Sequence, residues 1–214
     1  MSQPDMIKIL IADDHAIVRE GLKQILAEEP DMKVTGEAGN ADELLELLKK
    51  DVWNAVVLDI NMPGKSGLEA LKDLKKIYPD LPVLILSMYG EEQYGIRALK
   101  AGASGYLKKA SAPNEFVSAI RTIVKGKKYI SPILAENLAD NINPSNHHTN
   151  KLSDREYEIL RKIALSTSAE EIANDLCISV HTVYSYRNRI LEKLNLKTNV
   201  ELTQYAIQNK LIEL

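Results

Sequence analysis

The chain has 214 residues, of which 45% are hydrophobic, and its formal net charge is −3 at pH 7. This length favours two small domains over one large domain. The only cysteine, Cys177, excludes an internal disulfide and fits a reducing compartment. No apolar stretch is long enough to span a bilayer, and no signal-peptide pattern opens the chain. We therefore expect a soluble cytoplasmic protein, not a membrane-spanning or disulfide-stapled one.

Residues 7–126 alternate short apolar runs with amphipathic helical patterns. Five successive β-α units predict an α/β domain, with a parallel sheet covered by helices on both faces. The flavodoxin-like strand order 2-1-3-4-5 is the common arrangement for such a chain, and it leaves a crevice between the first and third strands. We expect the strands to occupy residues 7–12, 33–38, 55–58, 83–86 and 105–107.

Polar side chains follow these strands and would meet at one edge of the sheet. Asp13 and Asp14 follow the first strand, and Asp59 follows the third, an apolar run typical of a strand buried on both faces. Ser87 ends the fourth strand, and Lys108-Lys109 follow the fifth. Neighbouring strand-end residues point to opposite sides, so only one of these lysines should reach the edge. Crowded carboxylates repel each other unless a cation lies among them, and Mg²⁺ prefers oxygen ligands.

The hydroxyl and the ammonium at this edge would hold the outer oxygens of a phosphoryl group on Asp59 and offset its charge. A simpler interpretation exists for each residue alone. An aspartate after a strand is often a turn former or a helix cap, and Asp13-Asp14 directly precedes a helical pattern. Five such groups on four strand ends are much harder to explain by turn chemistry.

Residues 5–127 resemble the receiver domain of bacterial two-component response regulators, on the segments Ile11–His15, Leu58–Gly64, Leu86-Ser87 and Ala101–Lys109. The resemblance implies that Asp59 accepts a phosphoryl group from a sensor histidine kinase. It also implies that Mg²⁺ is bound by Asp14, Asp59 and the Asn61 carbonyl, with Asp13 assisting. Ser87 and Lys109 would contact the phosphoryl group, and Tyr106 would swing inward with Ser87. Two residues depart from the family pattern, Met88 in place of a small residue and Ala110 in place of proline.

Residues 128–150 are expected to form a linker that contains one short helix. Ile133, Leu134, Leu138 and Ile142 have the spacing of a short amphipathic helix. Residues 143–150 are polar and interrupted by proline, which is typical of an exposed linker, so we place a domain boundary near residue 150. His147-His148 within this stretch is interpreted as a pair of solvated residues, because no other metal ligands lie nearby in the sequence.

Residues 151–214 are predicted to form an all-α, four-helix domain. Ser153 and Glu156 have the spacing of a capping box at the start of its first helix. A three-residue turn ends at Ser179, a good N-cap for the helix that runs to about Leu194, so this pair of helices reads as a helix-turn-helix. Residues 181–197 carry four basic residues against Glu192 alone, a local excess that suits phosphate contact as well as an ordinary solvated face.

This second domain resembles the LuxR-type DNA-binding domain, on the segments Leu152–Glu156, Ala169–Ala173, Ile178-Ser179, Thr182-Val183 and Arg189–Leu194. Together the two halves resemble the NarL/FixJ family of response regulators. The resemblance places base-facing positions at Tyr184, Ser185 and Asn188, and phosphate contacts at Thr182, Arg187, Arg189 and Lys193. Ser179 is also expected among the DNA-binding residues. Tyr184 stands where lysine is common, which suggests an altered base preference. Ser166 stands where the family usually has glycine, and Tyr186 is expected in the core.

We therefore expect a phosphorylation-switched transcription regulator and not an enzyme acting on other substrates. Its expected partners are a sensor histidine kinase, double-stranded promoter DNA, a second copy in a phosphorylated homodimer and, as a further candidate, RNA polymerase. Two alternatives stay open. One is a Mg²⁺-dependent phosphohydrolase with Asp59 as nucleophile, although no substrate-binding insertion or second general acid is evident. The other is a DNA-binding protein whose receiver serves only for dimerisation or docking and is never phosphorylated.

Overall fold

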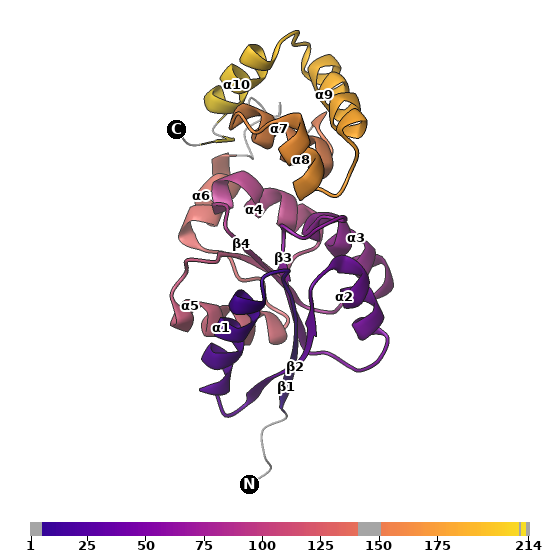
Figure 1. The fold of residues 1–214 in the computed structure, drawn as a ribbon. Helices are drawn as coiled ribbons and strands as arrows, with labels where there is room; N and C mark the ends of the chain where they lie inside the picture. The colour runs from indigo at the N-terminus through magenta and orange to yellow at the C-terminus, as the bar shows by residue number, and fades with distance from the viewer. Residues whose placement is uncertain (1–5, 141–150, 210, 213–214) are drawn as a thin grey trace. The chain divides into compact units, whose positions relative to one another are not determined.

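The computed structural model describes residues 6–140, 151–209 and 211–212, and it divides the chain into two compact units, residues 1–131 and 132–214 (Figure 1). We describe each unit by itself. The expected domain boundary near residue 150, Ile142 and the His147-His148 pair lie outside the described residues. No described helix is long and apolar enough to cross a membrane.

The first unit contains a five-stranded parallel sheet in the order β2-β1-β3-β4-β5, which confirms the flavodoxin-like prediction. All five residues of both β3 and β4 are buried, as expected for central strands covered on both faces. Because the strands run parallel, their carboxyl ends lie at one edge of the sheet. The strands are β1 (Ile7–Ala12), β2 (Met32–Ala38), β3 (Ala55–Asp59), β4 (Val83–Ser87) and β5 (Gly105–Lys108).

Five helices alternate with these strands, and α1 and α5 cover one face of the sheet while α2 and α3 cover the other (Figure 1). Inward side chains of α1 and α5, such as Leu22 and Ile120, join Ile9, Val57 and Leu84 of the strands in one buried cluster. A Cβ atom at Gly67 would lie 1.9 Å from the Asp59 carbonyl oxygen, so glycine lets α3 start against the end of β3. The helices are α1 (Ala16–Ala27), α2 (Ala41–Leu48), α3 (Gly67–Ile77), α4 (Glu91–Lys100) and α5 (Pro113–Val124).

Residues 127–131, which follow α5, lie along the free edge of β5. Tyr129 forms a parallel bridge with Gly105, and its backbone N–H donates to the Ser104 carbonyl at 2.8 Å. The Tyr129 hydroxyl donates to Glu115 of α5 at 2.9 Å, and Ser131 donates to the buried Glu91 at the start of α4. The beginning of the expected linker is thus bonded to the sheet and to two helices of the first unit. The short helix expected next is α6 (Pro132–Asp140).

Beyond α6, the second unit contains the four predicted helices α7 (Asp154–Ala164), α8 (Ala169–Asp175), α9 (Val180–Leu194) and α10 (Asn199–Gln208). Side chains at the N-caps Ser153, Ser168, Ser179 and Thr198 all accept backbone N–H groups, with full capping boxes at the first two. The core is built from residues buried on all four helices, including Leu160, Ile172, Val183, Ile190 and Leu202. The helix-turn-helix consists of α8, α9 and the turn between them.

Among the residues of this unit that the structure describes, three non-glycine residues adopt left-handed backbone angles. Ser166, between α7 and α8, has φ of 61°, Cys177 in the turn before α9 has 51°, and Asn195 after α9 has 56°. Asparagine tolerates this region better than serine does. The family's usual glycine at the position of Ser166 therefore has a conformational reason, and serine is strained there.

Candidate functional site

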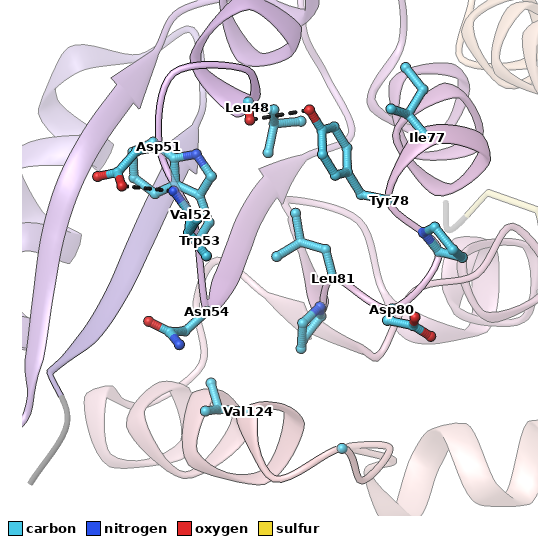
Figure 2. A pocket seen from close by; sticks show the side chains of 13 residues that line it. Leu48, Asp51, Val52, Trp53, Asn54, Ile77, Tyr78, Asp80, Leu81 and Val124 are labelled. Atoms are coloured by element: carbon cyan, nitrogen blue, oxygen red, sulfur yellow. Dashed lines mark hydrogen bonds between the residues drawn. The ribbon is translucent and has the colours of Figure 1, made fainter.

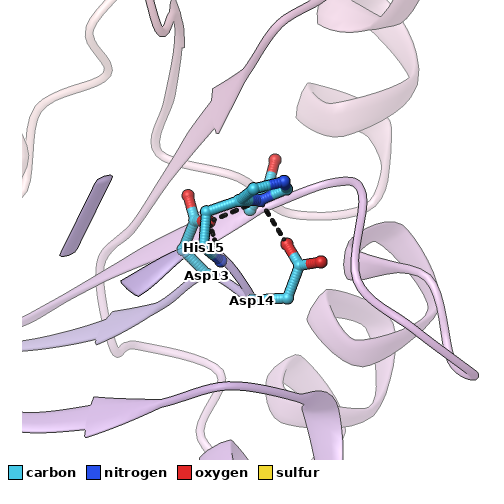
Figure 3. A group of neighbouring side chains, drawn as sticks. Asp13, Asp14 and His15 are labelled. Carbon is cyan, nitrogen blue, oxygen red and sulfur yellow. Dashed lines mark hydrogen bonds and ion pairs between the residues drawn. The ribbon is translucent and has the colours of Figure 1, made fainter. Parts of the chain in front are cut away.

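The carboxyl ends of β1 and β3 hold a compact acidic pocket. Asp59 is the last residue of β3 and is 1% exposed, and Asp13, directly after β1, is 2% exposed. One ligand atom from each of Asp13, Asp14, His15 and Asp59 lies within 4.8 Å of the others. Figure 3 shows Asp13, Asp14 and His15 grouped at the start of the loop after β1, with His15 Nδ1 2.7 Å from an Asp14 oxygen. The structure thus gathers carboxylates from two adjacent strand ends.

Lys109 is the lysine that reaches this pocket, whereas Lys108 is exposed. The Lys109 ammonium lies 2.6 Å from Asp13 Oδ2 and 2.8 Å from Asp59 Oδ2, and its side chain is 7% exposed. Its backbone N–H donates to the Ser87 carbonyl at 2.7 Å. Burial alone would lower the Lys109 pKa, but the two carboxylates outweigh burial and raise it. Lys109 is therefore a fixed cation between two buried acids.

Even with this lysine, the pocket disfavours the charge on Asp59. Burial raises the Asp59 pKa from 3.8 to about 6, against the opposing hydrogen bond and attraction from Lys109, and Asp13 adds repulsion. Asp59 Oδ1 and Asn61 Oδ1 are buried and have no hydrogen-bond partner among the described residues. These features fit a divalent cation with oxygen ligands such as Mg²⁺, which would offset the excess negative charge.

Two buried side chains, one on β4 and one on β5, are both bonded to the backbone of Tyr89. The Ser87 hydroxyl, at the carboxyl end of β4, accepts the Tyr89 N–H at 3.2 Å. The Tyr106 ring of β5 is fully buried, and its hydroxyl donates to the Tyr89 carbonyl at 2.9 Å. Tyr106 is therefore buried in this structure, and its expected swing together with Ser87 stays a prediction. Met88, which departs from the family pattern, has a side chain that is 64% exposed.

A hollow of about 620 Å³ lies at the opposite edge of the same sheet (Figure 2). It is lined by residues at the amino ends of β3 and β4, among them Trp53, Asn54, Tyr78, Leu81 and Pro82. The Tyr78 hydroxyl donates to the Leu48 carbonyl at 3.3 Å and holds α3 against α2. None of the residues that line the hollow belongs to the acidic pocket, so the two are separate.

The exposed face of α9 carries the three residues expected to face bases. Tyr184 is 50% exposed, Asn188 is exposed, and Ser185 is half-buried with its hydroxyl donating to the His181 carbonyl at 3.0 Å. At the start of the helix, Ser179 Oγ accepts the Thr182 N–H at 3.0 Å. This face is suited to insertion into a groove of DNA, because its polar side chains point away from the core.

The basic residues expected at phosphates differ in how they are held. Arg187 donates to Asn199 at 2.6 Å and to Asn188 at 3.1 Å. Arg189 lies over the ring of Tyr186, 5.6 Å from its centroid, and Tyr186 is half-buried instead of fully in the core. Lys193 Nζ lies 2.7 Å from Glu156 Oε2, a buried carboxylate of the α7 capping box. Lys193 is thus already paired within the domain.

Sequence reasoning did not single out three of these contacts. His15 carries no expected role of its own, although its place directly after Asp13-Asp14 puts it at the same strand end. Asn199 and Glu156 approach α9 from other helices, at separations of 12 and 37 residues from their partners. Helical periodicity identifies the face of a helix but not which residue of another helix meets it.

A flavodoxin-like domain with an acidic pocket at its strand ends, followed by a helix-turn-helix unit, defines a receiver joined to a DNA-binding module. The family model "Response regulator receiver domain" matches residues 9–121, and "Bacterial regulatory proteins, luxR family" matches residues 150–206. The chain belongs to the NarL/FixJ family of response regulators.

Its similarity to individual relatives covers almost the full length of each protein. It is 38% identical to the oxygen regulatory protein NreC of Staphylococcus carnosus, over 97% of this chain and 100% of NreC. It is 36% identical to the response regulator GacA of Pseudomonas aeruginosa, over 97% of this chain and 99% of GacA. A structure of RcsB from Salmonella enterica serovar Typhimurium, bound to promoter DNA with the phosphomimetic BeF3⁻, matches with a TM-score of 0.60 and 27% identity, over 94% of this chain and 98% of that one.

Proposed function

We propose that Asp59 accepts a phosphoryl group from a sensor histidine kinase, and that this modification switches sequence-specific DNA binding by the second domain. The observation that carries the proposal is the arrangement around Asp59. A buried carboxylate lies 2.8 Å from a fixed ammonium, Lys109, which also pairs with Asp13. The backbone of Lys109 is bonded to that of Ser87, whose buried side chain ends the neighbouring strand β4. This combination offers an acceptor oxygen together with groups that can hold the oxygens of the transferred group.

In the transfer, an Asp59 carboxylate oxygen forms a bond to phosphorus while the phosphorus–nitrogen bond to the kinase histidine breaks. The electron pair of that bond leaves with the imidazole, and the product on Asp59 is an acyl phosphate. Lys109 and Ser87 would then bind phosphoryl oxygens. Mg²⁺, held by Asp13, Asp14, Asp59 and the Asn61 carbonyl, would supply positive charge that offsets the charge of the transferred group.

The signal would leave the pocket through Tyr89. Ser87 and Tyr106 are both bonded to the backbone of Tyr89. A Ser87 hydroxyl that turns to donate to a phosphoryl oxygen would move its Oγ relative to the Tyr89 N–H, and so change the bond that now holds the loop before α4. Such a local charge event can bias a two-state element. A structure of RcsB contains dimers bound to DNA, and we propose the same assembly here. Two linked domains on two half-sites gain affinity through effective concentration.

We assign the receiver to residues 5–127, the linker to residues 128–150 and the DNA-binding domain to residues 151–214. Our proposed phosphate contacts are Thr182, Arg187, Arg189 and Lys193, and Ser179 is proposed as a further DNA-binding residue. A cytoplasmic location agrees with the exposed, unpaired Cys177 and with both proposed partners, a kinase phosphodonor and chromosomal DNA. Contact with RNA polymerase would follow from occupancy of a promoter.

The proposal is tested by incubating the protein with acetyl phosphate and Mg²⁺ and measuring intact mass and DNA binding. The wild type should gain one phosphoryl group and bind DNA more tightly, and Asp59→Ala should do neither. An Asp59→Ala protein that gains the same mass would remove Asp59 as the acceptor. Multiple turnover of a small phosphoester would support the phosphohydrolase alternative instead. Unchanged DNA affinity after phosphorylation would support a receiver used only for docking.

A further inference from the structure

Arg187 is held from two sides by asparagine side chains. Its Nε donates to Asn199 Oδ1 of α10 at 2.6 Å, and its Nη1 donates to Asn188 Oδ1 of the same helix at 3.1 Å. The arginine is half-buried, whereas both asparagines are exposed. A residue expected to contact phosphate therefore lies between a residue expected to face bases and the first residue of the next helix.

The chemistry of arginine fixes the orientation of both amides. A guanidinium has five N–H donors and no acceptor, so each asparagine must turn its oxygen, not its NH₂ group, toward Arg187. The Asn188 NH₂ group is thereby left to donate elsewhere. The other guanidinium N–H groups of Arg187 make no hydrogen bond to any residue that the structure describes, and a planar fork of this kind suits phosphate.

Asn199 is well placed to act as the fixed end of this arrangement. It begins α10, whose N-cap Thr198 accepts the Glu201 N–H, and α10 is anchored in the core by the buried Leu202 and Ala206. Arg187, by contrast, has a long side chain with many rotamers. A hydrogen bond to the short Asn199 side chain, on a helix anchored in the core, therefore restricts the rotamers of Arg187 more than bonds to water would.

We propose that Asn199 is a positioning residue for DNA reading: it holds Arg187, which in turn orients the Asn188 amide. The inference rests on the proposed DNA-binding function and goes further, because it names what Asn188 presents to a base. With its oxygen engaged by Arg187, Asn188 offers a donor, which pairs with acceptors such as guanine O6 or N7 and thymine O4. The two-bond recognition of adenine needs that oxygen as well as the NH₂ group, and Arg187 occupies one of the two lone pairs of the oxygen and fixes its direction.

The test uses the full-length protein treated with acetyl phosphate and Mg²⁺. Preferred sites are first selected by the wild type from random-sequence duplex DNA, and affinities are then measured for the selected site and its single-base variants. The variants are Asn199→Ala, Asn199→Asp, Arg187→Ala and the Asn199→Ala/Arg187→Ala double variant. Gln204→Ala, an exposed amide on the same helix, is the matched control, and thermal melting is measured for every protein.

Asn199→Ala should weaken binding to the selected site by about 3–10-fold, the usual effect of one hydrogen bond. It should also reduce discrimination at one base position, where the wild type prefers guanine or thymine. Asn199→Asp retains an acceptor for Arg187 and should keep the wild-type preference. The double variant should bind no worse than Arg187→Ala, because the two residues act in series.

The inference is overturned if Asn199→Ala discriminates bases as well as Gln204→Ala does, or if the two single losses add fully in the double variant. A strict adenine preference that depends on Asn188 would also overturn it. These results leave the proposed function intact. If instead the phosphorylated wild type selects no sequence at all, the proposed DNA-reading function itself fails.

Discussion

The acidic pocket and the exposed face of α9 are built on opposite plans. In the pocket, Asp13, Asp59 and Lys109 are fixed by burial at the ends of strands, and the strongest interactions are between full charges. On α9, Arg187 and Asn188 are held by hydrogen bonds to exposed side chains. Burial makes charge costly and therefore sensitive to a new anion, whereas exposure leaves side chains available to a large partner. The two plans suit a chemical switch and a reading surface, respectively.

The largest effect should come from Lys109→Met, which leaves two buried carboxylates without their cation. We expect a loss of about 3 kcal/mol in the free energy of unfolding at pH 7 without Mg²⁺, as for other broken buried pairs. Urea denaturation followed by circular dichroism measures it. Lys108→Met is the matched control and should change stability by less than about 0.5 kcal/mol, because Lys108 is exposed. If the two variants lost the same free energy of unfolding, burial of the Lys109 ammonium would not be the source of its contribution to stability.

Asp59→Asn should stabilise the metal-free protein at neutral pH. The folded pKa of Asp59, about 6, lies above its ordinary value of 3.8, so the folded state binds the proton more tightly than the unfolded state. Wild-type stability therefore falls as pH rises from about 4 to about 6, by up to roughly 3 kcal/mol. The variant avoids this loss, and its advantage should vanish below pH 4. Denaturation at several pH values tests the sign, and a variant less stable than wild type at pH 7 would refute it.

Lys193→Met, compared with Arg189→Met, tests whether the Lys193 side chain stabilises the folded domain as well as being a proposed phosphate contact. Burial works against the charge of Glu156, but Lys193 and the capping hydrogen bonds lower its pKa overall. That contribution is present at neutral pH and disappears as pH falls through the acidic range. We expect a loss of about 1 kcal/mol in the free energy of unfolding at pH 7. The buried Glu156 carboxylate loses its bond to Lys193 but keeps its capping bonds to Ser153. Arg189→Met should reduce the free energy of unfolding by less, because the Arg189 guanidinium lies over the Tyr186 ring and its residue is exposed. A larger loss for Arg189→Met than for Lys193→Met would contradict the stabilising role of the Lys193–Glu156 pair.

The smallest effect should come from Ser166→Gly, which removes left-handed strain before α8. We expect a gain of about 0.5–1 kcal/mol in stability, since glycine adopts a φ of 61° without a steric cost. Asn195→Gly is the control, because asparagine already tolerates this region and should gain little. Melting temperatures of the two variants provide the comparison. A gain at Asn195 equal to that at Ser166 would mean that residue type does not matter at these turns.

The sequence predicted the fold well because its signals are local. Apolar runs such as Val56–Leu58 identify buried strands. N-cap residues such as Ser153 and Ser179 directly precede the first residue of their helices, so the start of each helix can be recognised from a few neighbouring residues. The same logic brought Asp13, Asp59 and Ser87 to one sheet edge, because a parallel topology fixes where strand ends lie. Their role in phosphoryl transfer remains our proposal.

Contacts between helices were not predictable in this way. The pairing of Lys193 with Glu156 and of Arg187 with Asn199 depends on the crossing of α9 with α7 and α10, which no periodicity encodes. The depth of Tyr106 and its bond to Tyr89 likewise depend on how the loop before α4 closes over β5. Such contacts are set by packing in three dimensions, after the elements have formed.

Residues 127–131 hold the chain against the receiver unit up to the last residue before α6. Tyr129 lies against β5, the strand that carries Tyr106, and Ser131 is bonded to Glu91, two residues beyond Tyr89. The peptide that leads into α6 is consequently bonded to β5 and to the first residue of α4, the helix that follows the loop of Tyr89. If phosphorylation shifts the loop before α4, as we propose, the movement would reach Ser131 through Glu91 and would so be transmitted to the segment by which the chain leaves the receiver unit.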